Sequence, residues 1–248
     1  INQFTGWWTG VATGDFDGDG RLDIVASNWG ANTKYESFRR QPLRLFYGDL
    51  DGDATVDLIE AHTDQAGSKL VPDRPMYSVE KALPWLRERF PTHEAYSRAS
   101  LEELYGDRLK ATKELTANWL ESTLFLNRGD HFEVKPLPLE AQLSPGFGLC
   151  VGDFDGDGHE DIFLSQNFFA TQPETSRCDA GRGLWLRGDG HGSFTAVPGQ
   201  ESGVVVYGEQ RGCALADYDA DGRVDLVVTQ NGAATKLFHN VGAKTGLR

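Results

Sequence analysis

The residues of this chain best suited to chemistry are aspartates that recur in four short loops of one pattern. Each loop has the form Asp-x-Asp-x-Asp-x-x-x-Asp, and the four loops span residues 15–23, 49–57, 153–161 and 217–225. Aspartates at positions 1, 3 and 5 can converge on one centre, position 7 can offer its carbonyl oxygen, and position 9 can close the shell. Calcium takes about six to eight oxygen ligands at roughly 2.3–2.6 Å. The pattern therefore predicts about four calcium ions.

The predicted ligands are four carboxylates and one backbone carbonyl per loop. They are Asp15, Asp17, Asp19, Arg21, Asp23, Asp49, Asp51, Asp53, Thr55, Asp57, Asp153, Asp155, Asp157, His159, Asp161, Asp217, Asp219, Asp221, Arg223 and Asp225. Magnesium fits less well, because it demands a smaller octahedral shell and retains its waters. An EF-hand is excluded, because position 12 is Ala26, Leu164 or Val228 in three loops, where that motif needs Glu.

The second loop departs from the others at its turn. Ala54 occupies position 6, where the other three loops have glycine. Glycine permits the sharp turn that the ion requires. We therefore expect weaker binding or a strained backbone in the second loop.

The acidity of the chain belongs to these loops. The net charge is −13, yet 16 of the 37 acidic residues are loop aspartates, and without these aspartates 21 acids remain against 24 bases. This balance argues against a nucleic-acid partner. No apolar run is long enough to span a membrane. Of the three cysteines, Cys150 and Cys213 precede the third and fourth loops and are predicted to be buried thiols, whereas a disulfide involving Cys178 stays open.

The fold predicted from these repeats is all-β. Each loop joins two strand-like runs, and a further Gly/Asp turn with flanking strands follows the loops. In the third repeat the four expected strands are 146–152, 161–166, 183–186 and 193–197. Such units are typical of a β-propeller, or part of one, with four-stranded antiparallel blades. We expect one domain of about four units over residues 1–248, with the first unit short of strands and the last ending before its fourth.

A helical insertion is predicted at about 71–117. Residues 78–90 and 92–98 favour short helices, and Ser100 with Glu103 forms a capping box that begins a third. We place this insertion between the second and third strands of the second repeat. It is either a packed cap or part of a binding rim.

Two Arg-Gly-Asp tripeptides, at 128–130 and 187–189, invite an adhesion hypothesis. Both fall in a strand–turn–strand segment, where Gly and Asp are favoured because they suit the backbone conformation of a turn. The turn interpretation is favoured.

The loops with their flanking strands resemble the FG-GAP/VCBS repeats of integrin-α-type β-propellers, through residues 14–25 (GDFDGDGRLDIV) and 152–163 (GDFDGDGHEDIF). The stretch 124–248 resembles bacterial relatives of cartilage acidic protein, through 146–148, 179–186, 207–212 and 229–240. Those relatives carry a C-terminal ASPIC/UnbV-type region, which is absent or cut here and suggests a fragment. The resemblance implies calcium ligands at the sixteen loop aspartates and an extracytoplasmic location, whether secreted, periplasmic or on the cell surface.

Three function hypotheses remain. The first is a calcium-stabilised binding, adhesion or scaffold module with an unknown protein or glycan ligand. The second is a carbohydrate-active enzyme, a polysaccharide lyase or hydrolase, but its candidates Glu174, Glu209, Arg211 and His131 form no recognisable constellation. The third is a structural segment of a larger assembly. The sequence favours a binding module over an enzyme and names no catalytic residue.

Overall fold

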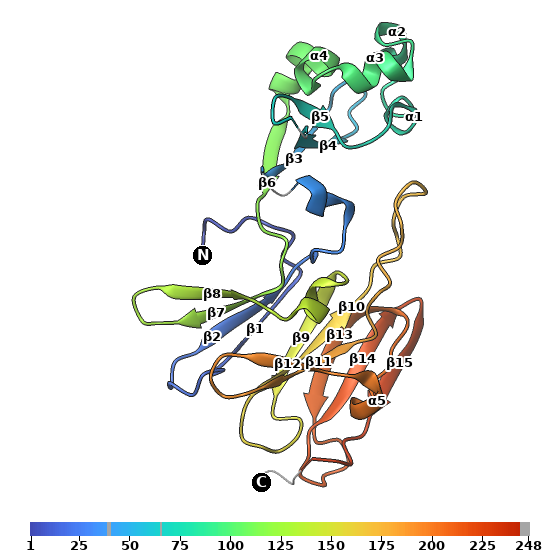
Figure 1. Cartoon of the computed structure of the whole chain (residues 1–248). Coiled ribbons are helices and arrows are strands. Elements are labelled where there is room, and N and C mark those ends of the chain that lie inside the picture. The colour runs from blue at the N-terminus through green and yellow to red at the C-terminus, as the bar shows by residue number, and fades with distance from the viewer. Residues whose placement is uncertain (39–40, 65, 244–248) are drawn as a thin grey trace. The chain divides into compact units, whose positions relative to one another are not determined.

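The computed structural model describes residues 1–38, 41–64 and 66–243. Within them, strands form four antiparallel sheets of three or four strands each (Figure 1). The strands are β1 (Gly10–Gly14), β2 (Asp23–Ser27), β3 (Leu43–Gly48), β4 (Asp57–Thr63), β5 (Leu70–Pro72), β6 (Lys113–Ala117), β7 (Thr123–Asn127), β8 (Phe132–Pro136), β9 (Gly146–Gly152), β10 (Asp161–Gln166), β11 (Leu184–Gly188), β12 (Phe194–Val197), β13 (Glu209–Ala216), β14 (Asp225–Asn231) and β15 (Ala233–Phe238). The all-β, propeller-type fold predicted from the repeats is confirmed.

The chain divides into two compact units. The first unit contains residues 7–33 and 120 onward, and the second contains 2–6 and 34–119. Three sheets belong to the first unit, with strand orders β1-β2-β7-β8, β9-β10-β11-β12 and β13-β14-β15. The four strands expected for the third repeat are confirmed, and the described part of the last sheet has three strands, as expected.

The hairpin β7–β8 completes the sheet of the first loop. Strand β2 pairs with β7, with Ile24 opposite Phe125. The expectation that the first repeat lacks strands is therefore wrong, because its third and fourth strands follow about 100 residues later. The pairing of β2 with β7 cannot be predicted from segments that are adjacent in the sequence, because residues 34–119 lie between them.

The first strands of the three sheets, β1, β9 and β13, are neighbours within the first unit (Figure 1). Glycines allow their backbones to approach closely. A Cβ on Gly10 would lie 2.2 Å from the Phe147 carbonyl oxygen, and one on Gly148 would lie 2.8 Å from the Gly212 Cα. The Ser27 hydroxyl donates to the same Phe147 carbonyl at 2.6 Å. These contacts hold the sheets side by side, as blades are held in a propeller.

The core of the first unit lies between its sheets. Every residue of β10 is buried, which suits its run of apolar side chains Ile162, Phe163 and Leu164. Two clusters of buried side chains result, one that includes Phe16, Leu126 and Leu186, and one that includes Cys150, Phe154 and Val228. The loops thus extend from strands whose positions are fixed by apolar packing.

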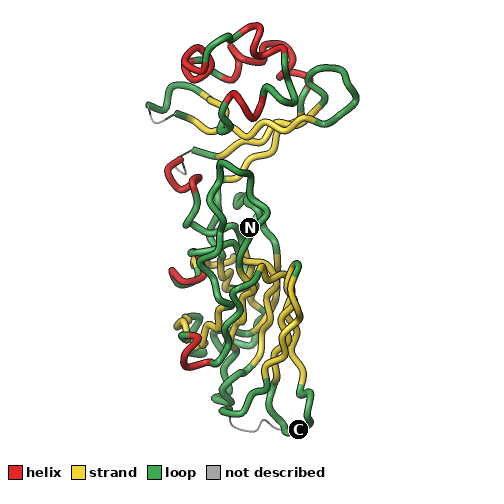
Figure 2. Tube along the Cα trace, turned by 90° about the vertical axis from the view of Figure 1, so that its right-hand side faces the viewer, coloured by secondary structure: helices red, strands yellow, loops and turns green. Residues whose placement is uncertain are grey.

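The second unit combines the sheet β5-β4-β3-β6 with short helices. The α-helices of the described chain are α1 (Met76–Val79), α2 (Trp85–Arg89), α3 (His93–Arg98), α4 (Leu101–Tyr105) and, in the first unit, α5 (Gly199–Ser202); the 3-10 helices are η1 (Lys34–Phe38), η2 (Gly106–Ala111) and η3 (Leu139–Gln142). Figure 2 shows helices α1–α4 gathered against the sheet of the second unit.

The predicted helical insertion is present, and its capping signals are confirmed. Thr92 caps α3, and Ser100 and Glu103 form the capping box of α4. Residues 78–90 form two helices instead of one, α1 and α2, with Pro84 at the N-cap of α2. The helices come between β5 and β6, so the expected place between a second and third strand is wrong. They share one core with the sheet, through Phe46, Ile59, Leu86 and Leu104 among others.

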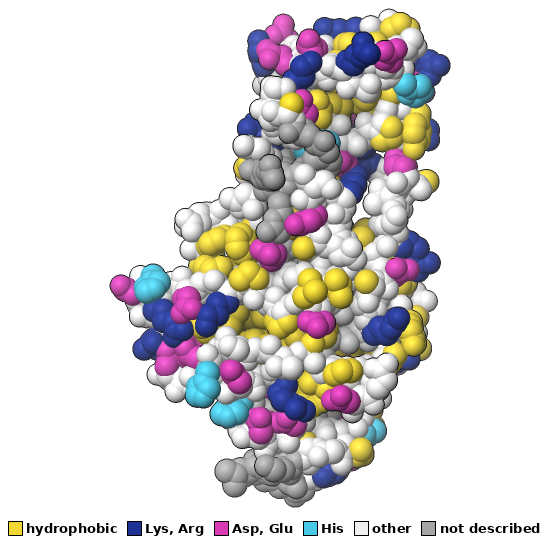
Figure 3. Space-filling view, viewed as in Figure 1, with side chains coloured by type: hydrophobic (Ala, Val, Ile, Leu, Met, Phe, Trp, Pro, Cys, Tyr) yellow, Lys and Arg dark blue, Asp and Glu magenta, His cyan; other side chains and the backbone are white. Residues whose placement is uncertain are grey.

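Among the described residues, none of the helices has the length and apolar character needed to cross a membrane. On the face in Figure 3, acidic and basic side chains are interspersed.

Candidate metal sites

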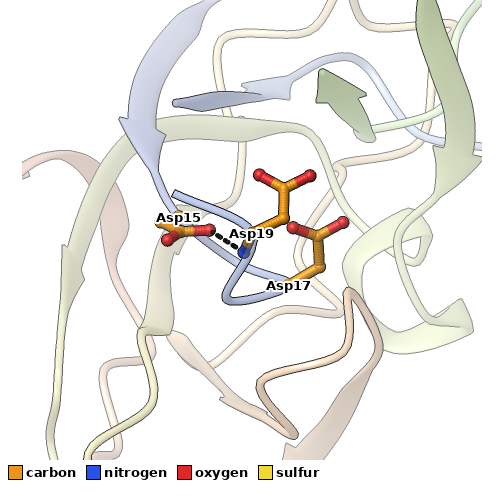
Figure 4. A group of neighbouring side chains, drawn as sticks. All are labelled: Asp15, Asp17 and Asp19. Carbon is orange, nitrogen blue, oxygen red and sulfur yellow. Dashed lines mark hydrogen bonds between the residues drawn. The ribbon is translucent and has the colours of Figure 1, made fainter. Parts of the chain in front are cut away.

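All four acidic loops connect the two strands of an antiparallel pair. They lie between β1 and β2, β3 and β4, β9 and β10, and β13 and β14. In each loop, three carboxylates bring oxygen atoms to within 4.8 Å of one another. In the first two loops these are positions 1, 3 and 5, such as Asp15, Asp17 and Asp19 (Figure 4). In the last two they are positions 1, 3 and 9.

The carboxylate at position 1 organises each loop through backbone hydrogen bonds. Asp15 accepts from the Asp19 amide at 3.1 Å and from the Gly20 amide at 3.0 Å, and the first of these is drawn in Figure 4. The same pair of bonds occurs in the third and fourth loops, and the position 6 amide is bound in the second as well. Position 5 in turn accepts the amide of position 7 in every loop. The four loops therefore share one backbone conformation.

That conformation requires a left-handed backbone at positions 4 and 6. Position 6 has φ of 83° at Gly20 and 66° at Ala54. Position 4 has φ of 72° at Gly18 and 60° at Ala220. The expected strain at Ala54 is present, since a non-glycine residue is disfavoured there. The strain at Ala220 was not predicted from the sequence, although Ala220 occupies position 4, where the other three loops have glycine.

In the three loops of the first unit, the aspartate at position 9 is buried and accepts hydrogen bonds from its own loop and from the end of the third strand. Asp161 accepts from the Phe154 amide at 3.0 Å and from the Gly188 amide, on β11, at 2.8 Å. Asp23 and Asp225 make the equivalent pairs of bonds. Each carboxylate oxygen has a second lone pair that a cation can use. In the second loop, Asp57 accepts from Leu50 at 3.0 Å and has no third-strand donor among the described residues.

Burial opposes ionisation of most of these position 9 carboxylates. It raises the pKa of Asp161 to about 6, and it raises the pKa of Asp23 and Asp57 as well. Burial also acts to raise the pKa of Asp225, but hydrogen bonds from the Asn240 and Tyr218 amides outweigh it, so that pKa is lowered. A nearby cation favours the ionised form of a buried carboxylate.

The residue at position 2 anchors the loop in the core. Phe16 is buried, and its ring meets that of Phe194 with centroids 5.5 Å apart. Its carbonyl accepts from the Gly192 amide at 2.9 Å. Phe154 packs in the same way against Trp185, at 5.9 Å. The first and third loops are therefore held by apolar contacts as well as by hydrogen bonds.

Basic side chains from the third strand of each sheet lie against the loops of the first unit. Arg128 pairs with Asp17 and lies 3.7 Å from Asp19. Arg187 Nε lies 2.8 Å from Asp155 Oδ2. His239 Nδ1 lies 3.7 Å from an oxygen of Asp219. These side chains were not named as part of the loops from the sequence, and their position at or just after the end of each third strand was the available signal.

The arginines of the two Arg-Gly-Asp tripeptides, Arg128 and Arg187, are two of these basic side chains. In both, the arginine pairs with the position 3 aspartate of the loop in its own sheet. Gly129 has φ of 90°, so the first tripeptide needs glycine for its turn. The turn interpretation is therefore supported by the contacts of both arginines.

The position 7 residues were predicted to offer a carbonyl oxygen. In the first and fourth loops their side chains have a further role. Arg21 Nε donates to the Asn127 carbonyl at 2.7 Å, and Arg223 Nε donates to the Asn240 carbonyl at 2.6 Å. Both arginines also pair with the position 5 aspartate of their own loop. These side chains therefore tie the loop to the end of the third strand.

Two of the enzyme candidates, Glu209 and Arg211, take part in a network of structural contacts. Glu209 is 4% exposed, and its carboxylate accepts from the Phe169 amide at 2.9 Å and the Asn231 side chain at 2.6 Å. It also pairs with Arg211, whose guanidinium lies 4.0 Å from the Phe147 ring centroid. Glu209 is thus engaged in structural contacts, as expected for a strand residue that pairs with its neighbours.

Comparison with known proteins supports the repeat family. Residues 7–36, which include β1, the first acidic loop and β2, match the family model of the FG-GAP repeat. A search of curated proteins finds no match to the chain.

The donor set of the loops fits a hard divalent cation such as calcium. Every converging side-chain atom is a carboxylate oxygen. In the first loop, Asp17 Oδ1 is buried and has no hydrogen-bond partner among the described residues. A buried charged oxygen without a partner is costly, and a bound cation would remove that cost.

Proposed function

We propose that the chain is a calcium-stabilised, extracytoplasmic repeat module that serves in binding or scaffolding. The observation that carries the proposal is the buried Asp17 Oδ1, which has no hydrogen-bond partner among the described residues and lies beside the carboxylates of Asp15 and Asp19. The repetition of one loop conformation four times adds support. The FG-GAP match at 7–36 favours a location outside the cytoplasm, where calcium is abundant enough for such loops.

In this proposal the ions stabilise the turns of the sheets and take no part in a reaction. Calcium would supply positive charge at the centre of each carboxylate group, and positions 1, 3, 5, 7 and 9 would hold it. The surrounding hydrogen bonds orient the carboxylates before the ion binds, which reduces the cost of ordering the loop. The likeness of residues 124–248 to relatives of cartilage acidic protein remains a prediction from the motifs.

The test is a calcium titration of the chain by calorimetry, with thermal unfolding in calcium and in EGTA. At a calcium concentration near 100 times Kd, one site adds about 2.7 kcal/mol, or roughly 5–10 °C in Tm. Magnesium at equal concentration should give a smaller rise. Asp17→Asn and Asp155→Asn should each remove about one ion from the stoichiometry.

Asp107→Asn is the matched control, because Asp107 is exposed and pairs only with Lys110 among the described residues. Its stoichiometry should equal that of the unchanged chain. A Tm that is the same in calcium and in EGTA would refute the proposed function.

A further inference from the structure

Two of the three cysteines lie on neighbouring first strands of the first unit. Cys150 is on β9, opposite Phe163 of β10, and Cys213 is on β13, opposite Val228 of β14. Both belong to one apolar cluster, in which Cys150 is 7% exposed and Cys213 is partly buried. The two strands are in contact although they belong to different sheets.

The backbones of these strands approach closely on the side that carries the cysteines. A Cβ on Gly148 would lie 2.8 Å from the Gly212 Cα and 3.1 Å from the Cys213 nitrogen. Side chains alternate along a strand, so Cys150 projects to the same face as Gly148. That face is therefore directed at β13 beside Cys213.

The Cys150 and Cys213 side chains lie in one apolar cluster between two strands that are in contact. A disulfide needs Cβ atoms about 3.5–4.5 Å apart, and strands whose backbones approach as closely as β9 and β13 can bring facing side chains into this range.

Cys178 is placed differently. It lies outside the sheets, where its backbone pairs with that of Phe168 in an isolated bridge. Its carbonyl accepts a hydrogen bond from the Ser144 hydroxyl at 3.1 Å. It is a free thiol that takes no part in the apolar cluster of the other two.

We propose that Cys150 and Cys213 form an intramolecular disulfide that joins the β9–β12 sheet to the β13–β15 sheet when the chain folds with a disulfide oxidant present. The Cys213 thiolate attacks one sulfur of a small disulfide such as oxidised glutathione, and one glutathione thiolate leaves. The Cys150 thiolate then attacks the Cys213 sulfur, and the second glutathione thiolate leaves. The protein gives up two protons and two electrons, and the oxidant becomes two glutathione thiols.

The consequence is a covalent link between two sheets that are otherwise held by packing and by hydrogen bonds. The link closes a loop from residue 150 to residue 213, so it restricts the unfolded chain strongly. For a chain of this size, Tm should rise by roughly 5–10 °C on oxidation. The link involves no metal, so the rise should be present at fixed calcium and equally in EGTA.

The experiment uses the full chain, unfolded under reducing conditions and refolded with oxidised and reduced glutathione. Free thiols are counted by alkylation and intact mass, and the cross-link is located by non-reducing peptide mapping. We expect one free thiol after refolding, a peptide pair that contains Cys150 and Cys213, and the stated rise in Tm, which dithiothreitol reverses.

The Cys178→Ala variant is the matched control that keeps the pair. It should refold with no free thiol and show the same reversible rise in Tm. Cys213→Ala should retain both remaining thiols and show no rise. Three alkylated thiols in the refolded chain, or two in Cys178→Ala, would overturn the proposal, as would a cross-link that contains Cys178.

Discussion

The backbone amide of Asn127 donates a hydrogen bond to Asp23 Oδ1 at 2.7 Å, although the two residues are 104 positions apart. The same relation links Gly188 to Asp161 and Asn240 to Asp225 in the other two sheets of the first unit. The last aspartate of each loop in the first unit therefore fixes the end of the third strand of its sheet. Its role in the fold can be measured separately from its role as a candidate calcium ligand.

Asp23→Asn tests this structural role. The amide group is of the same size, but its Nδ2 cannot accept from the Phe16 or Asn127 amide, so one buried N–H loses its partner. We expect a loss of about 1–3 kcal/mol in the free energy of unfolding, measured by denaturant titration in EGTA. The absence of calcium from the assay removes any contribution from the ion.

The control for Asp23→Asn is Asp157→Asn in the third loop. Asp157 is exposed, and its carboxylate accepts only the local His159 amide among the described residues. Asp157→Asn should change the free energy of unfolding in EGTA by no more than about 0.5 kcal/mol. Equal costs for the two variants would mean that position 9 has no special structural role.

The acidic loops could be predicted from the sequence because their determinants are local. Nine consecutive residues contain the carboxylates, the turn positions and the start of the next strand. The partner of Asp23 could not be predicted in this way. It comes from β7, beyond the whole second unit, and nothing in the spacing of the loops marks β7 as the neighbour of β2.

The same distinction explains the insertion. Its helices were predicted, because the cap at Thr92 and the capping box at Ser100 are local signals. Its place in the topology was predicted wrongly, because β6 pairs with β3 and only then does the chain return to the first sheet. Strand pairing over such separations depends on tertiary packing.

Ala220→Gly should stabilise the chain. Ala220 has φ of 60°, where a Cβ is unfavourable and glycine is not. We expect a gain of about 0.5–1 kcal/mol in the free energy of unfolding, after allowing for the greater freedom of glycine in the unfolded chain. Thermal unfolding of the metal-free chain is the measurement. Ala54 has φ of 66°, so Ala54→Gly should give a similar gain in the free energy of unfolding of the second unit.

Ala214→Gly provides the control for the alanine substitutions. Ala214 is exposed on β13 and pairs with Val227 in extended conformation. Glycine there should cost roughly 0.5–1 kcal/mol. The strain argument is wrong if Ala220→Gly and Ala214→Gly change stability in the same direction.

Gly10→Ala tests the close approach of the first strands. The added Cβ would lie 2.2 Å from the Phe147 carbonyl oxygen, so β1 and β9 must separate. We expect a cost of about 1–3 kcal/mol in denaturant titrations. In Gly242→Ala the added Cβ meets nothing within 4 Å, so that variant should be nearly neutral. A neutral Gly10→Ala would show that the strands are farther apart than described.

Arg128→Gln should raise the calcium affinity of the first loop. The Arg128 guanidinium pairs with Asp17 and lies 3.7 Å from Asp19, so its charge opposes a cation at the same carboxylates. Because the contact is partly exposed, the expected gain is roughly two- to fivefold at low salt and smaller at high salt. Calorimetry is performed in a background that carries Asp51→Asn, Asp155→Asn and Asp219→Asn, so that the first loop dominates binding.

Arg44→Gln is the charge-matched control for Arg128→Gln, because Arg44 pairs with Glu114 at 3.2 Å in the second unit. Arg44→Gln changes the net charge of the chain by the same amount but leaves the first loop intact. The calcium affinity of the first loop should therefore stay close to that of the background chain. Equal gains in the two variants would assign the effect to net charge. An unchanged or lower affinity in Arg128→Gln would instead show that Arg128 orients Asp17 for the ion more than it competes with it.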